Sequence, residues 1–169
     1  MQNFVRPCFG QDLETVRLIA AHHALTGFSW LESQPPSEAD LVAAWSRTVD
    51  AGLPYIVACP RSDPSRVLGF GYAQEGLFGS PLLCGRPELR LAVHPSHLRK
   101  GLGALLLSAL LEDLASAGAA GASCSFGHEE ASAPLALVTR AKFTKAVRLS
   151  AAARKFGKVY DVVVATRAL

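Results

Sequence analysis

The sequence has few of the features that mark membrane-spanning or secreted proteins. Its leucine-rich run after residue 101 is broken by Ser108, Glu112 and Asp113, short of the about 18 apolar residues that a membrane span needs. The first 14 residues, "MQNFVRPCFGQDLE", lack the uninterrupted apolar core of a signal peptide. We therefore expect a cytoplasmic protein that does not bind a membrane.

Cysteine and histidine are too scattered to form a recognisable metal site. The chain has four cysteines without CxxC spacing, at Cys8, Cys59, Cys84 and Cys124. This spacing indicates neither a zinc site nor a disulfide framework, so we expect small core residues in a reducing compartment. The adjacent His22 and His23 would point in different directions on a helix, and His94, His97 and His128 have no helical i, i+4 partner. We predict no metal.

The chain has neither a strong charge imbalance nor an internal linker. Its 17 Lys and Arg residues against 14 Asp and Glu residues give a net charge of +3, and the basic residues are scattered except near the C-terminus. This distribution does not favour nucleic acid as a partner. No long charge run or Pro/Ser-rich linker divides the 169 residues, half of which are hydrophobic. We expect one domain over residues 1–169.

Hydrophobic periodicity predicts a chain of mixed strands and helices. A strand at residues 3–8 and a helix at 12–25 come first, and a second helix begins after Ser37, a suitable N-cap, and ends at Gly52. The later elements are a strand hairpin (54–59 and 66–76), a strand (88–94), a leucine-rich helix (102–117), a strand (121–127), a helical segment (133–141) and two final strands. This order predicts an α/β sandwich, with helices on both faces of a mixed sheet.

A basic loop with two glycines, "HPSHLRKGLGA", joins the strand at 88–94 to the leucine-rich helix. Six backbone amides of the loop can point toward one anion at the helix N-terminus: those of Leu98, Arg99, Lys100, Gly101, Leu102 and Gly103. The chain contains no Gly-Lys-Ser or Gly-Lys-Thr, which argues against a P-loop, and no third glycine completes a Rossmann fingerprint. The loop is therefore predicted to bind phosphate by another arrangement.

The loop resembles the acetyl-CoA loop of the GNAT N-acetyltransferase superfamily, whose motif reads Arg/Gln-x-x-Gly-x-Gly/Ala between a strand and a helix. Four stretches are similar to the phosphinothricin and methionine-sulfoximine acetyltransferase branch: "VRPCFGQDL" (5–13), "GFSWLESQPP" (27–36), "ELRLAVHPSH" (88–97) and "RKFGKVYDVV" (154–163). In that branch the third stretch reads Glu-x-Ser-(Val/Ile)-Tyr-Val-His-Pro-x-His, and the fourth contains Arg-Lys-Phe-Gly-x-Trp-x-Asp. The resemblance covers nearly the whole chain.

This resemblance implies the GNAT fold, in which the strand before the loop splays from its neighbour, here residues 121–127. It implies acetyl-CoA as co-substrate, with the pyrophosphate on the loop and the pantetheine arm on the strand, at Leu91, Ala92, Val93, Leu98, Arg99, Lys100, Gly101, Leu102, Gly103 and Ala104. Glu88 lies at the position of the family's general-base glutamate. The alternative is that Glu88 is only an exposed residue at the start of a strand. Phe28 and Trp30 are candidates to line the acceptor pocket, or else pack in the core.

Two functional classes follow from the resemblance. The first is an N-acetyltransferase that acts on the primary amine of a small molecule such as an amino-acid analogue, with direct attack and Glu88 as general base. The second is a catalytically weak or inactive protein that binds CoA as a sensor.

Proteins of the branch usually form dimers, and the apolar stretch "VYDVVVATRAL" at 159–169 is expected to leave a sheet edge for a partner. We expect a homodimer.

Several positions depart from the pattern of the branch. Leu98 replaces the Arg or Gln that opens the loop motif, Ala131 an Asn, Val138 a His, Lys142 and Ala153 a Gly each, and Val159 a Trp. Lys142 must either bear about 1 kcal/mol of strain or end its helix differently, because the glycine there normally adopts a positive φ. These departures fall mainly on the acceptor side, so we expect the cofactor half of the site to be the better preserved.

Overall fold

The computed structural model describes residues 2–76, 86–128 and 133–169, so Cys84 and Ala131 lie outside the described residues. The elements are β1 (Asn3–Pro7), η1 (Gly10–Asp12), α1 (Leu13–Thr26), α2 (Glu38–Asp50), β2 (Tyr55–Pro60), β3 (Gly69–Gln74), β4 (Glu88–Val93), η3 (Pro95–His97), α3 (Leu102–Ser116), β5 (Gly121–Gly127), α4 (Ala133–Arg140), β6 (Lys145–Lys155) and β7 (Lys158–Ala168). The predicted order of strands and helices is confirmed. Ser37 caps α2 as predicted, because its hydroxyl accepts a hydrogen bond from the amide of Asp40 at 3.1 Å.

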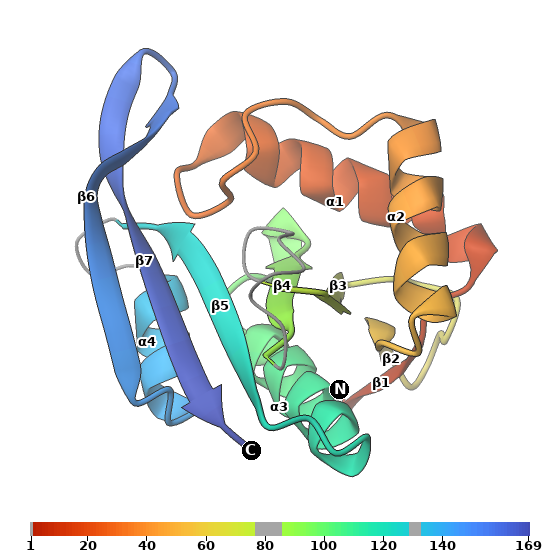
Figure 1. The fold of residues 1–169 in the computed structure, drawn as a ribbon. Coiled ribbons are helices and arrows are strands. Elements are labelled where there is room, and N and C mark those ends of the chain that lie inside the picture. Colours follow the sequence, from red (N-terminus) through yellow and green to blue (C-terminus); the bar gives the residue numbers. More distant parts are fainter. Residues whose placement is uncertain (1, 77–85, 129–132) are drawn as a thin grey trace.

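A seven-stranded sheet in the order β1-β2-β3-β4-β5-β7-β6 separates two helical layers (Figure 1). Its neighbouring strands are antiparallel except β4 and β5, which are parallel. α1 and α2 pack on one face over Val57 and Phe70, and α3 and α4 pack on the other over Leu89. Because side chains alternate along a strand, Glu88 and Arg90 of β4 face the layer of α1 and α2. The mixed sheet with helices on both faces is as predicted.

The last strand is not the edge that the sequence suggested. β7 pairs with β5 on one side and with β6 on the other, so β6 is the edge strand and the expectation for residues 159–169 is wrong. A two-residue turn joins β6 to β7, with Phe156 at φ 51° and Gly157 at φ 74°. The hairpin reaches the segment between α1 and α2 (Figure 1), where the rings of Phe156 and Phe28 lie 5.7 Å apart.

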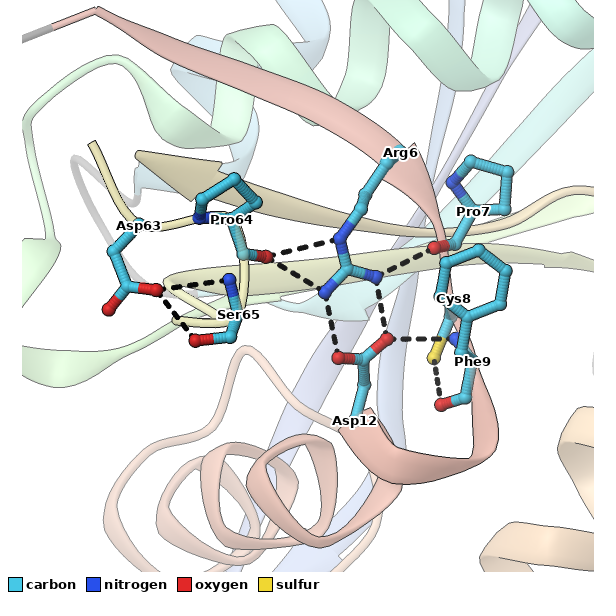
Figure 2. Close-up of polar contacts among 8 residues, drawn as sticks. All are labelled: Arg6, Pro7, Cys8, Phe9, Asp12, Asp63, Pro64 and Ser65. Carbon is cyan, nitrogen blue, oxygen red and sulfur yellow. Dashed lines mark hydrogen bonds and ion pairs between the residues drawn. The ribbon is translucent and has the colours of Figure 1, made fainter. Parts of the chain in front are cut away.

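A polar network fixes the start of α1 to the sheet (Figure 2). Two nitrogens of Arg6 on β1 donate to the carboxylate of Asp12 at 2.7 and 2.8 Å, and Arg6 also donates to the carbonyl of Pro64 in the turn before β3. Burial acts to raise the pKa of Asp12, but the hydrogen bonds from Arg6 and from the amide of Phe9 hold that pKa below its usual value. The ion pair therefore holds the α1 layer in place at pH 7.

None of the helices in residues 2–76, 86–128 and 133–169 has the length and apolarity that a membrane crossing requires.

Candidate functional site

The parallel strands β4 and β5 separate almost as soon as they meet. Glu88 and Ser123 are the one pair in register between them, next to a hydrogen bond from the Ser123 amide to the Pro87 carbonyl at 2.9 Å. β4 nevertheless stays paired with β3 along its whole length. The side of β4 that faces β5 is therefore left without a strand partner beyond Leu89, as the resemblance implied, and the two ribbons diverge in Figure 1.

The register of β4 decides which of its backbone groups face this gap. The amide of His94 donates to the carbonyl of Leu68, and backbone groups alternate in direction along an antiparallel pair. The amide and carbonyl of Leu91 and Val93 consequently point toward β5, whereas those of Ala92 point toward β3. The imidazole Nε2 of His23 lies 2.8 Å from the Val93 carbonyl and donates to it. Burial lowers the pKa of His23, which keeps the ring neutral.

The loop after β4 presents free backbone amides at the N-terminus of α3. Leu105 is the first residue whose amide bonds within the helix, to the carbonyl of Gly101 at 3.1 Å, so the three amides before it have no helical acceptor. Gly101 caps the helix with φ 82°, and Arg99 also has a positive φ of 59°. The Leu98 amide differs from the expectation, since it lies 3.4 Å from the Pro95 carbonyl and donates to it. Of the loop amides, those of residues 102–104 are therefore the best placed to bind an anion.

The side chains of the loop contribute little to this anion site. Leu98 is exposed, and the ammonium of Lys100 donates to the carbonyl of Ser96 at 2.9 Å. At Gly103 a side chain would begin 3.5 Å from Leu137 and 3.9 Å from Leu91, close to the mouth of the gap. Backbone amides at a helix N-terminus can bind an anion without a charged side chain, so this arrangement does not depend on the Arg or Gln that Leu98 replaces.

Glu88 is completely buried, and each of its carboxylate oxygens accepts a hydrogen bond. Its exposed fraction is 0%, so the alternative of an exposed residue at the strand start is wrong. The side-chain amide nitrogen Nε2 of Gln74 donates to Oε2 at 2.8 Å, and the hydroxyl of Ser125 donates to Oε1 through a short hydrogen bond. Ser125 lies two residues beyond Ser123 on β5, where the strands have already separated. Its hydroxyl therefore connects the carboxylate with the gap.

Arg90 lies beside Glu88 on the same face of β4. Its Nε is 3.6 Å from Oε1 of Glu88, and its Nη1 donates to both carboxylate oxygens of Glu32 at 2.8 and 2.9 Å. Burial acts to lower the pKa of Arg90, but the negative charges of Glu32 and Glu88 outweigh it, and the pKa is raised. The guanidinium stays charged between two carboxylates.

The segment between α1 and α2 covers this charged group. The ring of Trp30 lies 5.8 Å from the Arg90 guanidinium and packs edge-on against Phe70 at 6.1 Å. Phe28 packs on Tyr160 and Phe156 of the hairpin, and both candidate residues are half-buried. Trp30 therefore borders the charged cluster, whereas Phe28 joins the segment to the hairpin.

Lys155 fixes this segment from the end of β6. Its ammonium is buried and donates to the carbonyl of Trp30 at 2.9 Å and to that of His23, in the last turn of α1, at 3.4 Å. The carbonyls of a last helical turn lack helical donors and carry partial negative charge, which suits a cation. This contact gives a structural reason for Lys155, the first lysine of "RKFGK" (154–158).

The departures from the family pattern have different structural outcomes. Val138 is buried in the core on the α3 side, and Val159 is exposed near the hairpin turn. Lys142 adopts φ 59°, and the helix ends with the paired hydrogen bonds of a Schellman motif, from Lys142 to Thr139 and from Phe143 to Val138, each at 3.0 Å. The chain thus keeps the turn and bears the strain.

The sequence reasoning missed Arg90, Glu32, Lys155 and Ser125. Arg90 had a signal, because a charged residue inside the apolar strand "LRLAV" must find a counter-charge when it is buried. The other three had no signal of this kind, since their partners are distant in sequence. In the part of the chain that the structure describes, no group of three or more His, Cys, Asp or Glu side chains could hold a metal ion.

The chain is similar in sequence to known acetyltransferases. The family model described as Acetyltransferase (GNAT) family matches residues 20–135, more than half of the chain. Phosphinothricin N-acetyltransferase of Alcaligenes faecalis is 30% identical over 167 residues, which cover 98% of this chain and 82% of that protein.

Solved structures show the same fold. A phosphinothricin acetyltransferase from Sinorhizobium meliloti in complex with acetyl-CoA matches with a TM-score of 0.89 and 26% identity, over 100% of this chain and 89% of that chain. A putative acetyltransferase from Salmonella typhimurium with its cofactor acetyl-CoA has the same TM-score at 21% identity, over 99% and 94% of the two chains.

Proposed function

Because the chain belongs to the acetyltransferase (GNAT) family, we propose that it transfers an acetyl group from acetyl-CoA to the primary amine of a small molecule, with Glu88 as general base. The observation that carries this proposal is the position of Glu88. It is a buried carboxylate at the point where β4 and β5 begin to separate. A sensor that only binds CoA has no need of a carboxylate there.

The backbone of residues 99–104 would hold the pyrophosphate, and the free amide and carbonyl groups of Leu91, with the amide of Val93, would pair with the pantetheine arm. Acetyl-CoA supplies a thioester whose carbonyl carbon bonds to the amine nitrogen while the carbon–sulfur bond breaks. The nitrogen gives up its second proton to the leaving sulfur, so that an amide forms and CoA leaves as a thiol. Gly101 and Gly103 let the backbone come close to the phosphates. These residues bind and orient, and none of them has to move a proton.

Proton removal falls to Glu88. An alkylammonium has a pKa of about 10, so the acceptor must lose a proton before its nitrogen can attack. Glu88 accepts this proton, directly or through the hydroxyl of Ser125, which donates to Oε1 and lies on the separated part of β5. The hydrogen bond from Gln74 holds the carboxylate in place during the transfer.

The experiment measures free thiol released from acetyl-CoA with a panel of small amines that includes phosphinothricin and methionine sulfoximine. Glu88→Gln keeps the shape of the side chain, and we expect it to lower kcat at least about 100-fold without weakening CoA binding. Glu112→Gln removes an exposed carboxylate on α3 and serves as the matched control. Equal activity in Glu88→Gln and the wild type would contradict the base role.

A thermal melt with and without CoA, combined with the thiol assay, distinguishes the alternatives. A protein whose melting temperature rises with CoA but which releases no thiol with any amine is the sensor. If CoA does not raise the melting temperature, the cofactor assignment itself is wrong, because a ligand of the folded state must stabilise it.

A homodimer stays a proposal that rests on the resemblance, and sedimentation at micromolar concentration tests it.

A further inference from the structure

A buried cation with spare donor capacity lies next to the proposed general base. The Arg90 side chain is nine-tenths buried, and a single nitrogen, Nη1, makes both hydrogen bonds to Glu32. Its Nε is buried and has no hydrogen-bond partner among the described residues, being 3.6 Å from the nearest Glu88 oxygen. A guanidinium normally binds a carboxylate through two nitrogens in parallel. In Arg90 this paired mode is not used.

A second buried donor without a partner among the described residues belongs to Tyr160, whose ring lies 5.0 Å from that of Phe28 in the segment that carries Glu32. The hydroxyl of Tyr160 on β7 is buried and makes no hydrogen bond within the described part of the chain. Burial, and then the negative charge of Glu32, raises its pKa. Leaving a buried donor unpaired is costly. Of the five unpaired buried side-chain atoms among the described residues, these two belong to residues that contact Trp30 and Phe28 of one segment, where a ligand with further acceptor atoms would satisfy them.

Glu32 itself is the replaceable member of the cluster. It lies in the segment between α1 and α2, outside any helix or strand, and its side chain is 47% exposed, against 10% for Arg90. Its carboxylate can turn into solvent without leaving a buried charge of its own. Arg90 cannot do so, because it is enclosed by Trp30, Glu88 and the sheet.

We infer that Arg90 is a specificity-determining residue that binds a carboxylate of the acceptor, and that Glu32 occupies this position as an internal substitute until the acceptor displaces it. The inference rests on the proposed function for the placement of the amine. Glu88 and Arg90 are two residues apart on one face of β4, so an acceptor that carries both an amine and a carboxylate meets a base and a cation side by side. Nothing in the backbone loop that holds the cofactor provides this selection.

The test is a binding measurement that does not depend on turnover. Methionine sulfoximine and its carboxamide, which differ by one carboxylate, are titrated calorimetrically into the CoA-saturated protein. We expect the wild type to bind the carboxylate form at least about tenfold more tightly, as for a charge-assisted hydrogen bond. In Glu32→Gln the carboxylate form should bind up to about fivefold more tightly than in the wild type, because the competing ion pair is gone, while the carboxamide is unaffected.

Two arginine variants and one control complete the design. Arg90→Met should abolish the preference for the carboxylate form, and Arg90→Lys, which keeps the charge but loses the fork, should retain part of it if the first variant does not fold. Glu14→Gln breaks a surface ion pair with Arg17 far along α1 and should change neither affinity. Equal tightening of both ligands in Glu32→Gln, or an undiminished preference in Arg90→Met, overturns the inference.

The two proposals fail in different ways. Selective binding of the carboxylate form without thiol release from any amine would contradict the acetyltransferase proposal and support the role of Arg90. Thiol release that is equally efficient with both probes in the wild type would support the acetyltransferase and overturn the role of Arg90.

Discussion

The cofactor half and the acceptor half of the candidate site are built in different ways. The cofactor half, as proposed, is one continuous stretch, residues 88–104, and the groups that it offers are backbone amides and carbonyls. The acceptor half brings together β4, the segment between α1 and α2, and the β6–β7 hairpin, and its contacts are made by side chains. A backbone site tolerates substitutions such as Leu98, whereas a side-chain site changes its ligand when a single residue changes.

The same difference predicts which substitutions each half can accept. The amides at 102–104 remain available whatever their side chains are, provided that the glycines let the phosphates approach. On the acceptor side, Arg90 has one carboxylate on each side, at Glu32 and Glu88, so a change at one of the three alters the charge balance of the others. We therefore expect relatives to share the cofactor and differ in the acceptor.

The largest expected effect is the loss of the cofactor half through one side chain. Gly103→Leu places a branched group at the mouth of the gap, where even a Cβ is within 3.5 Å of Leu137. We expect the Kd for acetyl-CoA to rise about 100-fold, because the phosphates can no longer approach the amides, while the helix gains stability from the loss of a glycine. Isothermal titration and a melting curve measure both. Gly10→Leu, at a position with open space around it, is the control; unchanged acetyl-CoA affinity in Gly103→Leu would contradict the loop assignment.

The loop between β4 and α3 could be predicted from the sequence, whereas most side-chain contacts of the acceptor half could not. The loop was predictable because its residues are contiguous and its geometry follows from glycine and the helix N-terminus. Local signals also predicted the Ser37 cap and the extent of β5. Arg90 and Glu32 are 58 residues apart, and Lys155 and Trp30 are 125 apart, so their contacts depend on the whole fold. The edge assignment for β7 was wrong for the same reason, because strand pairing is non-local.

A smaller effect should separate the two halves at Lys155. Lys155→Met removes the ammonium that binds the carbonyls of Trp30 and His23, which loosens the segment carrying Trp30 and Glu32. We expect the KM for the acceptor to rise about tenfold and the protein to lose about 1–3 kcal/mol of stability, the cost of leaving buried polar groups unpaired. The KM for acetyl-CoA should stay unchanged. Steady-state kinetics with each substrate varied in turn, and a urea melt, measure these effects.

The control for Lys155 lies directly across the hairpin turn. Lys158 pairs with Lys155 in register but is exposed, so Lys158→Met removes the same charge without freeing a buried carbonyl. It should leave both KM values unchanged. A parallel rise in the KM for acetyl-CoA in Lys155→Met would mean that the two halves are coupled, and the comparison between them would fail.

The smallest effect is expected at Lys142, which adopts the backbone conformation of a glycine without being one. Its φ of 59° completes the Schellman motif at the end of α4, and α4 packs Val138 into the core beside the cofactor half. Lys142→Gly relieves strain of about 1 kcal/mol, partly offset by the greater freedom of glycine in the unfolded chain, so the free energy of unfolding should rise by less than about 1 kcal/mol. Lys158→Gly, at an ordinary strand position, should instead lower it. Chemical denaturation of both variants measures the difference, and a destabilised Lys142→Gly would show that the lysine side chain contributes more than its backbone conformation costs.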